Sequence, residues 1–121
     1  MSLLLIRAGF LIFMNKQIKN RISEISKLCE NYKVDKLWIF GSANTSAFNE
    51  KSDFDFLVSF GDMDLVDYAE CYFLLVEKLE LLLARNVDLV TVKSLSNPYF
   101  IESVEESKLL IYDRQNQEIL V

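Results

Sequence analysis

The run DFDFLVSF at residues 53–60 constrains the fold more than any other part of this sequence. It begins as strict alternation of acidic and aromatic residues, a period of two that is typical of a strand with one buried face. The face that we expect to be buried consists of Phe54, Phe56, Val58 and Phe60. Burial of this aromatic face fixes the register of the strand, which directs Asp53 and Asp55 outward from the core.

Periodicity along the rest of the chain predicts helices and short strands around this segment. We expect helices at residues 15–31, 64–84 and 98–108, further strands at 36–40, 87–92 and 109–112, and a loop or one short helix at 42–51. Asn15 is a suitable cap for the first helix. This order indicates one small α/β (α+β) domain, with a mixed sheet of about four strands flanked by helices.

The first thirteen residues differ from the rest because residues 3–13 are almost entirely apolar. They are too few to span a bilayer, which needs about 20 apolar residues, and they lack the flanking features of a secretory signal. We interpret residues 1–13 as an appendage before a single domain at 14–121. The alternative is a first strand or helix that packs on the core. We expect a cytoplasmic protein, because two cysteines cannot form a dense disulfide framework.

Several kinds of chemistry are excluded by what the 121 residues lack. The absence of histidine excludes Ser-His-Asp and Cys-His catalysis and every zinc site that needs imidazole. Three isolated glycines allow neither a dinucleotide-binding turn nor a P-loop. A net charge of −5 gives no reason to expect direct DNA binding. Catalysis must therefore use carboxylates, hydroxyls and lysines, and we expect a metal ion to assist them.

Asp53 and Asp55 are the first candidates for such a site. On a strand they lie about 6–7 Å apart on the same face, where their charges repel each other. A divalent cation would remove this conflict, because Mg²⁺ is held by carboxylates and substrate phosphates. An isolated D-x-D on a strand is more often a solvated acidic face, so this interpretation needs further residues.

Two further features strengthen it. Gly41 and Ser42 directly follow the predicted strand at 36–40, a position where free backbone N–H groups bind phosphate, although such a pair alone is usually only a turn. Asp88 lies inside the predicted strand at 87–92, on the same face as Val90 and Val92, so we do not expect it to be freely solvated. A neighbouring strand could place it beside Asp53 and Asp55, and three carboxylates make a two-metal site plausible.

The run GSANTSAFNEKSDFDFLVSF at residues 41–60 resembles the signature of the polymerase-β-like nucleotidyltransferase superfamily. That signature combines Gly-Ser, a spacer of about ten residues, Ser-Asp-x-Asp and an apolar run. The resemblance covers most of the chain from Met14 onward. The short chain is similar to the minimal nucleotidyltransferases (MNT) that are the smaller partners of HEPN-domain proteins. A nucleotidyltransferase fold is therefore expected.

The resemblance also implies roles for individual residues. It assigns ATP binding to Gly41, Ser42 and Ser52, and two Mg²⁺ or Mn²⁺ ions to Asp53, Asp55 and Asp88. Asp88 would complete the metal site that activates the acceptor hydroxyl. One departure from the family pattern is the stretch at 43–46, which lacks the basic residues that family members often carry there. The nearest substitutes in the sequence are Lys51, Arg85 and Lys93.

The implied activity is transfer of AMP from ATP to a tyrosine of a HEPN toxin, so that the protein acts as an antitoxin. An alternative is a catalytically degenerate module that neutralises its partner by binding alone, which the neutral stretch at 43–46 favours. Transfer to a small molecule such as an aminoglycoside is less favoured, because 121 residues leave no room for the second domain of such enzymes. Leu74 and Leu81, set among charges in the predicted helix at 64–84, hint at a partner surface. The sequence leaves the oligomeric state open.

Overall fold

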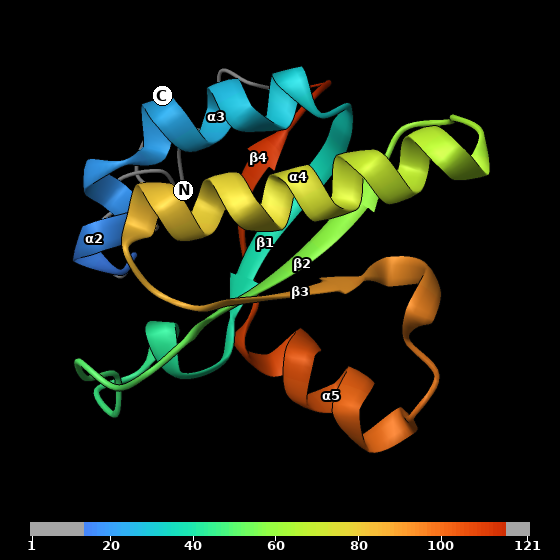
Figure 1. Cartoon of the computed structure of the whole chain (residues 1–121). Coiled ribbons are helices and arrows are strands. Elements are labelled where there is room, and N and C mark those ends of the chain that lie inside the picture. The colour runs from blue at the N-terminus through green and yellow to red at the C-terminus, as the bar shows by residue number, and fades with distance from the viewer. Residues whose placement is uncertain (1–13, 116–121) are drawn as a thin grey trace.

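A computed structural model describes residues 14–115 of the chain. The elements, in chain order, are α2 (Lys16–Asn20), α3 (Ile22–Asn31), β1 (Val34–Phe40), η1 (Gly41–Asn44), β2 (Phe54–Phe60), α4 (Leu65–Leu83), β3 (Val87–Thr91), η2 (Val92–Ser94), α5 (Pro98–Ser107) and β4 (Leu109–Asp113) (Figure 1). The predicted appendage at residues 1–13 lies outside the described residues. No helix within 14–115 is long and apolar enough to cross a membrane.

The four strands form one mixed sheet in the order β3-β2-β1-β4. Strand β1 is antiparallel to both β2 and β4, whereas β2 and β3 are parallel. Helices α3 and α4 lie together on one side of the sheet, and α5 lies on the other (Figure 1). The predicted mixed sheet of about four strands flanked by helices is thus confirmed.

The aromatic face of β2 forms the centre of the main core. Phe54, Phe56 and Val58 are fully buried among apolar residues of α2, α3 and α4, and Phe60 is half-buried at the end of the strand. This confirms the register that the alternation predicts. The alternation suggested that the opposite face of β2 is open to solvent, but this face is partly covered. Leu57 packs there against Phe40 of β1 and Val104 of α5, so α5 covers part of the face that carries the aspartates.

The helix predicted at 15–31 is divided at Arg21 into α2 and α3. Asn15 caps α2 as predicted, because its side-chain oxygen accepts hydrogen bonds from the backbone N–H groups of Gln17 (2.9 Å) and Ile18 (3.2 Å). Asp64 caps α4 in the same way, because its side-chain oxygen accepts a hydrogen bond from the Asp67 N–H at 2.8 Å. Local capping chemistry therefore sets the start of both helices.

Both cysteines lie in the core and are not bonded to each other. Cys29 is fully buried, and Cys71 is 9% exposed. Burial raises the pKa of the Cys29 thiol, and burial is also the main cause of the raised pKa of Cys71. A raised pKa leaves little thiolate at neutral pH, so neither cysteine is a reactive nucleophile.

Candidate active site

The three aspartates selected from the sequence lie at the start of the two parallel strands. Asp55 and Asp88 are direct register partners across β2 and β3, and Asp53 precedes Asp55 by two residues. Asp53 itself lies just before β2, which begins at Phe54. The prediction that a neighbouring strand brings Asp88 beside Asp55 is confirmed.

The three carboxylates differ in their exposure to solvent. Asp55 is half-buried, whereas Asp53 and Asp88 are exposed. The expectation that Asp88 is shielded by valines on its own face was wrong. Asp88 lies near the start of β3, which is the edge strand of the sheet, and Val92 has already left that strand for η2. An exposed carboxylate at a sheet edge can be reached by an incoming substrate.

The electrostatics of the site centre on Asp55. Burial raises the pKa of this carboxyl above its ordinary value, and the neighbouring charges of Asp88 and Asp53 raise that pKa further. Both effects disfavour the negatively charged form of Asp55. A bound cation would reverse the effect of the neighbouring charges.

The donor chemistry of the three aspartates fits such a cation. Within residues 14–115, no three acidic or cysteine side chains are gathered closely enough to hold a metal ion as they stand. The backbone nevertheless places Asp55 and Asp88 at paired positions of β2 and β3, with Asp53 just before β2. Carboxylate oxygens are the ligands that Mg²⁺ and Mn²⁺ prefer, and rotation of exposed side chains can draw them together.

The Gly-Ser turn lies directly against the central carboxylate. Phe40, the last residue of β1, is the register partner of Asp55, and Gly41 then turns away with a φ of +75°. A Cβ atom at Gly41 would lie only 2.6 Å from the Asp55 Oδ2 atom. Glycine is therefore required twice at this position, for its backbone conformation and for the close approach.

Helix α5 anchors this turn from the far side. The Gly41 N–H donates to the Ser107 hydroxyl at 3.1 Å. The Asn44 side-chain amide donates to the carbonyl oxygens of Ile39 (2.9 Å) and Ser107 (2.6 Å). Ser107 was missed in the sequence, which gives no signal for it, because it is 66 residues away from Gly41 along the chain.

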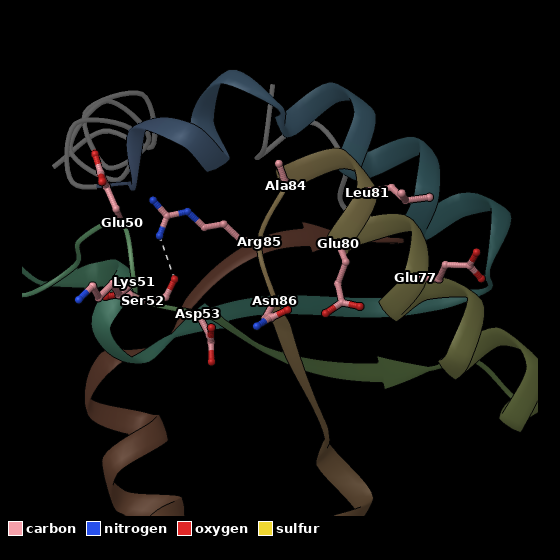
Figure 2. A pocket seen from close by; sticks show the side chains of 10 residues that line it. All are labelled: Glu50, Lys51, Ser52, Asp53, Glu77, Glu80, Leu81, Ala84, Arg85 and Asn86. Atoms are coloured by element: carbon pink, nitrogen blue, oxygen red, sulfur yellow. Dashed lines mark hydrogen bonds between the residues drawn. The ribbon is translucent and has the colours of Figure 1, made fainter.

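Ser52 shapes the turn that leads into β2, as the sequence predicts. Its hydroxyl accepts from the Asn49 N–H at 3.0 Å, and its own N–H donates to the Asn49 carbonyl at 3.0 Å. The Arg85 guanidinium, from the segment between α4 and β3, donates to the Asn49 carbonyl at 2.7 Å. It also donates to the Ser52 carbonyl at 2.8 Å (Figure 2). It also lies 4.5 Å from the centroid of the Phe48 ring.

These contacts assign Arg85 to the loop and not to the phosphates of a nucleotide. Lys93, the second candidate for a substitute cation, has its ammonium group 5.6 Å from the centroid of the Tyr68 ring. Lys51 is exposed in the turn before Ser52. Arg85 therefore does not take the place of the basic residues that the stretch at 43–46 lacks. The expectation of free backbone N–H groups at the turn was wrong for Gly41, because its N–H donates to the Ser107 hydroxyl.

An open pocket of about 520 Å³ adjoins the aspartates. It lies between the loop before β2 and the C-terminal end of α4, and it reaches the three aspartates only at Asp53 (Figure 2). Glu77, Glu80 and Leu81 line it on the α4 side. Asp53 is thus exposed toward this pocket among residues 14–115.

Replacing Arg85 with alanine should lower the free energy of unfolding by about 2 kcal/mol, because two charge-assisted hydrogen bonds to loop carbonyls are lost. The exposed Arg21 makes only a surface pair with Glu24 at 3.2 Å, so Arg21→Ala should change that free energy by less than about 0.5 kcal/mol. Urea denaturation of the two variants tests the difference. Equal effects would show that Arg85 does not anchor the loop.

Comparison with known proteins identifies the family to which this geometry belongs. Residues 23–117 match the family model described as polymerase beta, nucleotidyltransferase. The chain belongs to this nucleotidyltransferase family. The resemblance that rested on residues 41–60 is thereby confirmed over most of the chain.

Two relatives from Methanocaldococcus jannaschii and two solved structures extend this assignment. "Putative protein adenylyltransferase MJ1379" is 39% identical over 97 residues, which cover 80% of this chain and 92% of the relative. "Putative protein adenylyltransferase MJ0128" is 40% identical, over 79% of this chain and 94% of the relative. A crystal structure of a toxin-antitoxin with AMP-PNP has a TM-score of 0.60 and 26% identity, covering 82% of this chain and 79% of the other. The structure of a tri-AMPylated HEPN toxin of Shewanella oneidensis in complex with its MNT antitoxin has a TM-score of 0.55 and 25% identity, covering 85% and 80%.

Proposed function

We propose that this nucleotidyltransferase transfers AMP from ATP to a tyrosine hydroxyl of a HEPN-domain toxin, in a reaction that depends on Mg²⁺ or Mn²⁺. The observation that carries the proposal is the position of Asp55, which pairs with Asp88 across the strands and has Gly41 packed against its carboxylate. The turn to which we assign phosphate binding thus contacts one of the carboxylates to which we assign the metal ions. The protein would act as an antitoxin in the cytoplasm, where ATP and Mg²⁺ are available.

Each residue has one role in the proposed reaction. We assign the β- and γ-phosphates to the turn that begins at Gly41, whose own N–H is held by Ser107, and to the Ser42 hydroxyl. Ser52 holds the turn that presents Asp53. Asp53 and Asp55 would hold two metal ions. Asp88 would complete the coordination of the ion that activates the acceptor hydroxyl. When bound, the ions neutralise charge on the transferring phosphoryl group and on pyrophosphate.

The bond changes follow from these positions. The acceptor oxygen attacks the α-phosphorus of ATP, and the bond between that phosphorus and the bridging oxygen of the β-phosphate breaks as pyrophosphate leaves. Asp88, or a water molecule beside it, accepts the proton of the hydroxyl. The exposure of Asp88 at the sheet edge supports this role, because a protein acceptor can approach it there.

The names of the relatives and structural neighbours support a protein acceptor and an adenine nucleotide. Two relatives are named as protein adenylyltransferases, one neighbour is a toxin-antitoxin with AMP-PNP, and another is a complex with a tri-AMPylated toxin. The neutral stretch at 43–46 favours the second candidate, a module that silences its toxin by binding alone.

Labelled ATP separates the two candidates. The purified protein, Mg²⁺ and a HEPN-domain toxin from the same genome are incubated with ATP radiolabelled at either the α- or the γ-phosphate. We expect only the α-label to reach the toxin, on a tyrosine identified by mass spectrometry, and Asp53→Asn should abolish this labelling. A toxin that is neutralised equally well by the Asp53→Asn variant, without label, would establish the binding module instead.

A further inference from the structure

The solvent-facing side of α4 carries a regular pattern that the proposed reaction does not use. The buried side of this helix consists of Cys71, Leu75, Leu79 and Leu83, spaced four residues apart. On the opposite side lies a row of exposed residues, which we call the outer stripe: Val66, Glu70, Phe73, Glu77 and Leu81. Apolar and acidic side chains alternate along it at intervals of three or four residues, so all five lie on one line of the helix surface.

The apolar members of the outer stripe are far more exposed than a core-facing helix requires. Val66 is 76% exposed, Phe73 is 69% exposed and Leu81 is 70% exposed. Single exposed apolar side chains are common, but three in line over a helix about 28 Å long indicate a contact surface. Of the two leucines that hinted at a partner surface in the sequence, Leu81 is exposed and Leu74 is half-buried.

The outer stripe ends at the proposed active site. Leu81 and Glu77 line the pocket that reaches Asp53 (Figure 2). A molecule that lies along α4 therefore reaches, at the C-terminal end of the helix, the pocket that Asp53 lines. This continuity suits a protein that lies along α4 and also reaches the active site.

The charges of the outer stripe disfavour a second copy of this chain as the occupant. Antiparallel pairing of two copies about Phe73 would place Glu70 opposite Glu77 of the other copy. Parallel pairing would place each glutamate opposite itself. Like charges meet in both arrangements, which weakens such an interface. Lys78, the nearest cation on α4, points about 100° around the helix from Glu77 and does not relieve this repulsion.

We infer that the outer stripe is the docking surface for a helix of the acceptor protein, in which apolar side chains alternate with lysine or arginine. Apolar residues of that helix contact Val66, Phe73 and Leu81, and its basic residues pair with Glu70 and Glu77. The inference rests on the proposed function for the identity of the acceptor, and it adds where and by what chemistry the acceptor is held.

A pair of synthetic helical peptides of about the length of α4 tests the inference. The cationic peptide carries leucines spaced to meet the three apolar residues and lysines spaced to meet the two glutamates. The anionic peptide has glutamate in place of each lysine. Fluorescence anisotropy with wild-type protein should show binding of the cationic peptide and not of the anionic one.

Charge reversal makes the test specific to α4. Glu70→Lys/Glu77→Lys should weaken binding of the cationic peptide at least about tenfold and gain binding of the anionic peptide. Phe73→Ala should weaken binding of the cationic peptide to the wild type and of the anionic peptide to the charge-reversed variant. Its melting temperature should change little, because the Phe73 ring is 69% exposed and packs edge-on against Tyr72. The matched control is Glu102→Lys/Glu106→Lys on α5, which makes the same change in net charge at two exposed positions and should leave binding unchanged.

Several results would overturn the inference. Equal weakening by the α5 control would reduce the effect to net charge, and a wild-type dimer dispersed by Phe73→Ala would make a second copy the occupant. Failure of the cationic peptide to bind the wild-type protein would also overturn the inference. Stabilisation by Mg²⁺ and ATP is read on the same samples, so loss of peptide binding with that stabilisation intact rejects the docking surface and leaves the proposed function standing.

Discussion

Replacing Asp55 with asparagine should lower nucleotidyl transfer by a factor of about a thousand or more, while it stabilises the metal-free protein. The loss of activity follows from the proposed role of Asp55 as a ligand of ions that offset charge in the transition state, an effect worth about 4 kcal/mol. The gain in stability follows because Asp55 is half-buried and faces the charges of Asp88 and Asp53. Solvent screening limits that gain to about 0.5 kcal/mol, or roughly 2–4 °C.

The pH dependence of this gain has a definite sign. The pKa of Asp55 is raised in the folded protein above its unfolded value of about 3.8. The folded state therefore holds the proton more tightly, and wild-type stability falls as pH rises from about 4 through the folded pKa. The Asp55→Asn variant lacks this loss, so the difference in melting temperature between the two proteins should widen over that pH interval.

Asp35→Asn is the matched control, because Asp35 is a half-buried aspartate of β1 outside the proposed site. It should retain activity. Activity assays and thermal unfolding from pH 3.5 to 7.5 measure both effects. An Asp55→Asn variant that keeps more than a tenth of the wild-type rate would contradict the metal-binding role of Asp55.

Gly41→Ala should both destabilise the protein and abolish most of its activity. An alanine must adopt the left-handed φ of +75° and place its Cβ within 2.6 Å of the Asp55 Oδ2 atom, so either the turn or the carboxylate must move. We expect a loss of roughly 2 kcal/mol in the free energy of unfolding. Because a displacement of about 1 Å at a reacting centre costs about a hundredfold in rate, the turnover should fall by at least that factor.

Gly61→Ala provides the comparison for this variant. Gly61 has no left-handed φ, and its nearest neighbours to an added Cβ are an Arg114 side-chain nitrogen at 3.2 Å and the Lys33 carbonyl oxygen at 3.5 Å. A flexible arginine can move by a few tenths of an ångström, so this variant should keep its activity. If Gly41→Ala were as active as Gly61→Ala, the close approach of the turn to Asp55 would have no catalytic importance.

The parts of the fold that could be predicted from the sequence are those with a local physical signal. Alternation in residues 53–60 fixed which face of β2 is buried, and a single acceptor side chain at Asn15 marked the start of a helix. The juxtaposition of Asp55 and Asp88 could also be anticipated, because both lie on predicted strands near the same end. In the first two cases the information lies within a few residues of sequence, whereas the third also requires β2 and β3 to be neighbours.

The parts that could not be predicted depend on contacts between distant segments. The coverage of Leu57 by α5, and with it the half-burial of the face that carries Asp55, follows from packing across the sheet. The anchoring of Gly41 by Ser107 and of Ser52 by Arg85 joins residues 66 and 33 positions apart. A serine or an arginine gives no local sign of such a partner, so Arg85 resembled a phosphate ligand until its position was known.

Thermal unfolding with nucleotide tests the central claim most directly, because it requires no acceptor. Wild-type protein and the Asp53→Asn/Asp55→Asn variant are each heated with Mg²⁺ or Mn²⁺ and with each of the four nucleoside triphosphates. ATP at about 100 times its dissociation constant should stabilise the wild type by about 2.7 kcal/mol, which is several degrees for a chain of this size. The shift should require the metal and disappear in the variant. An unchanged melting temperature with every nucleotide at millimolar concentration would contradict a working nucleotide site.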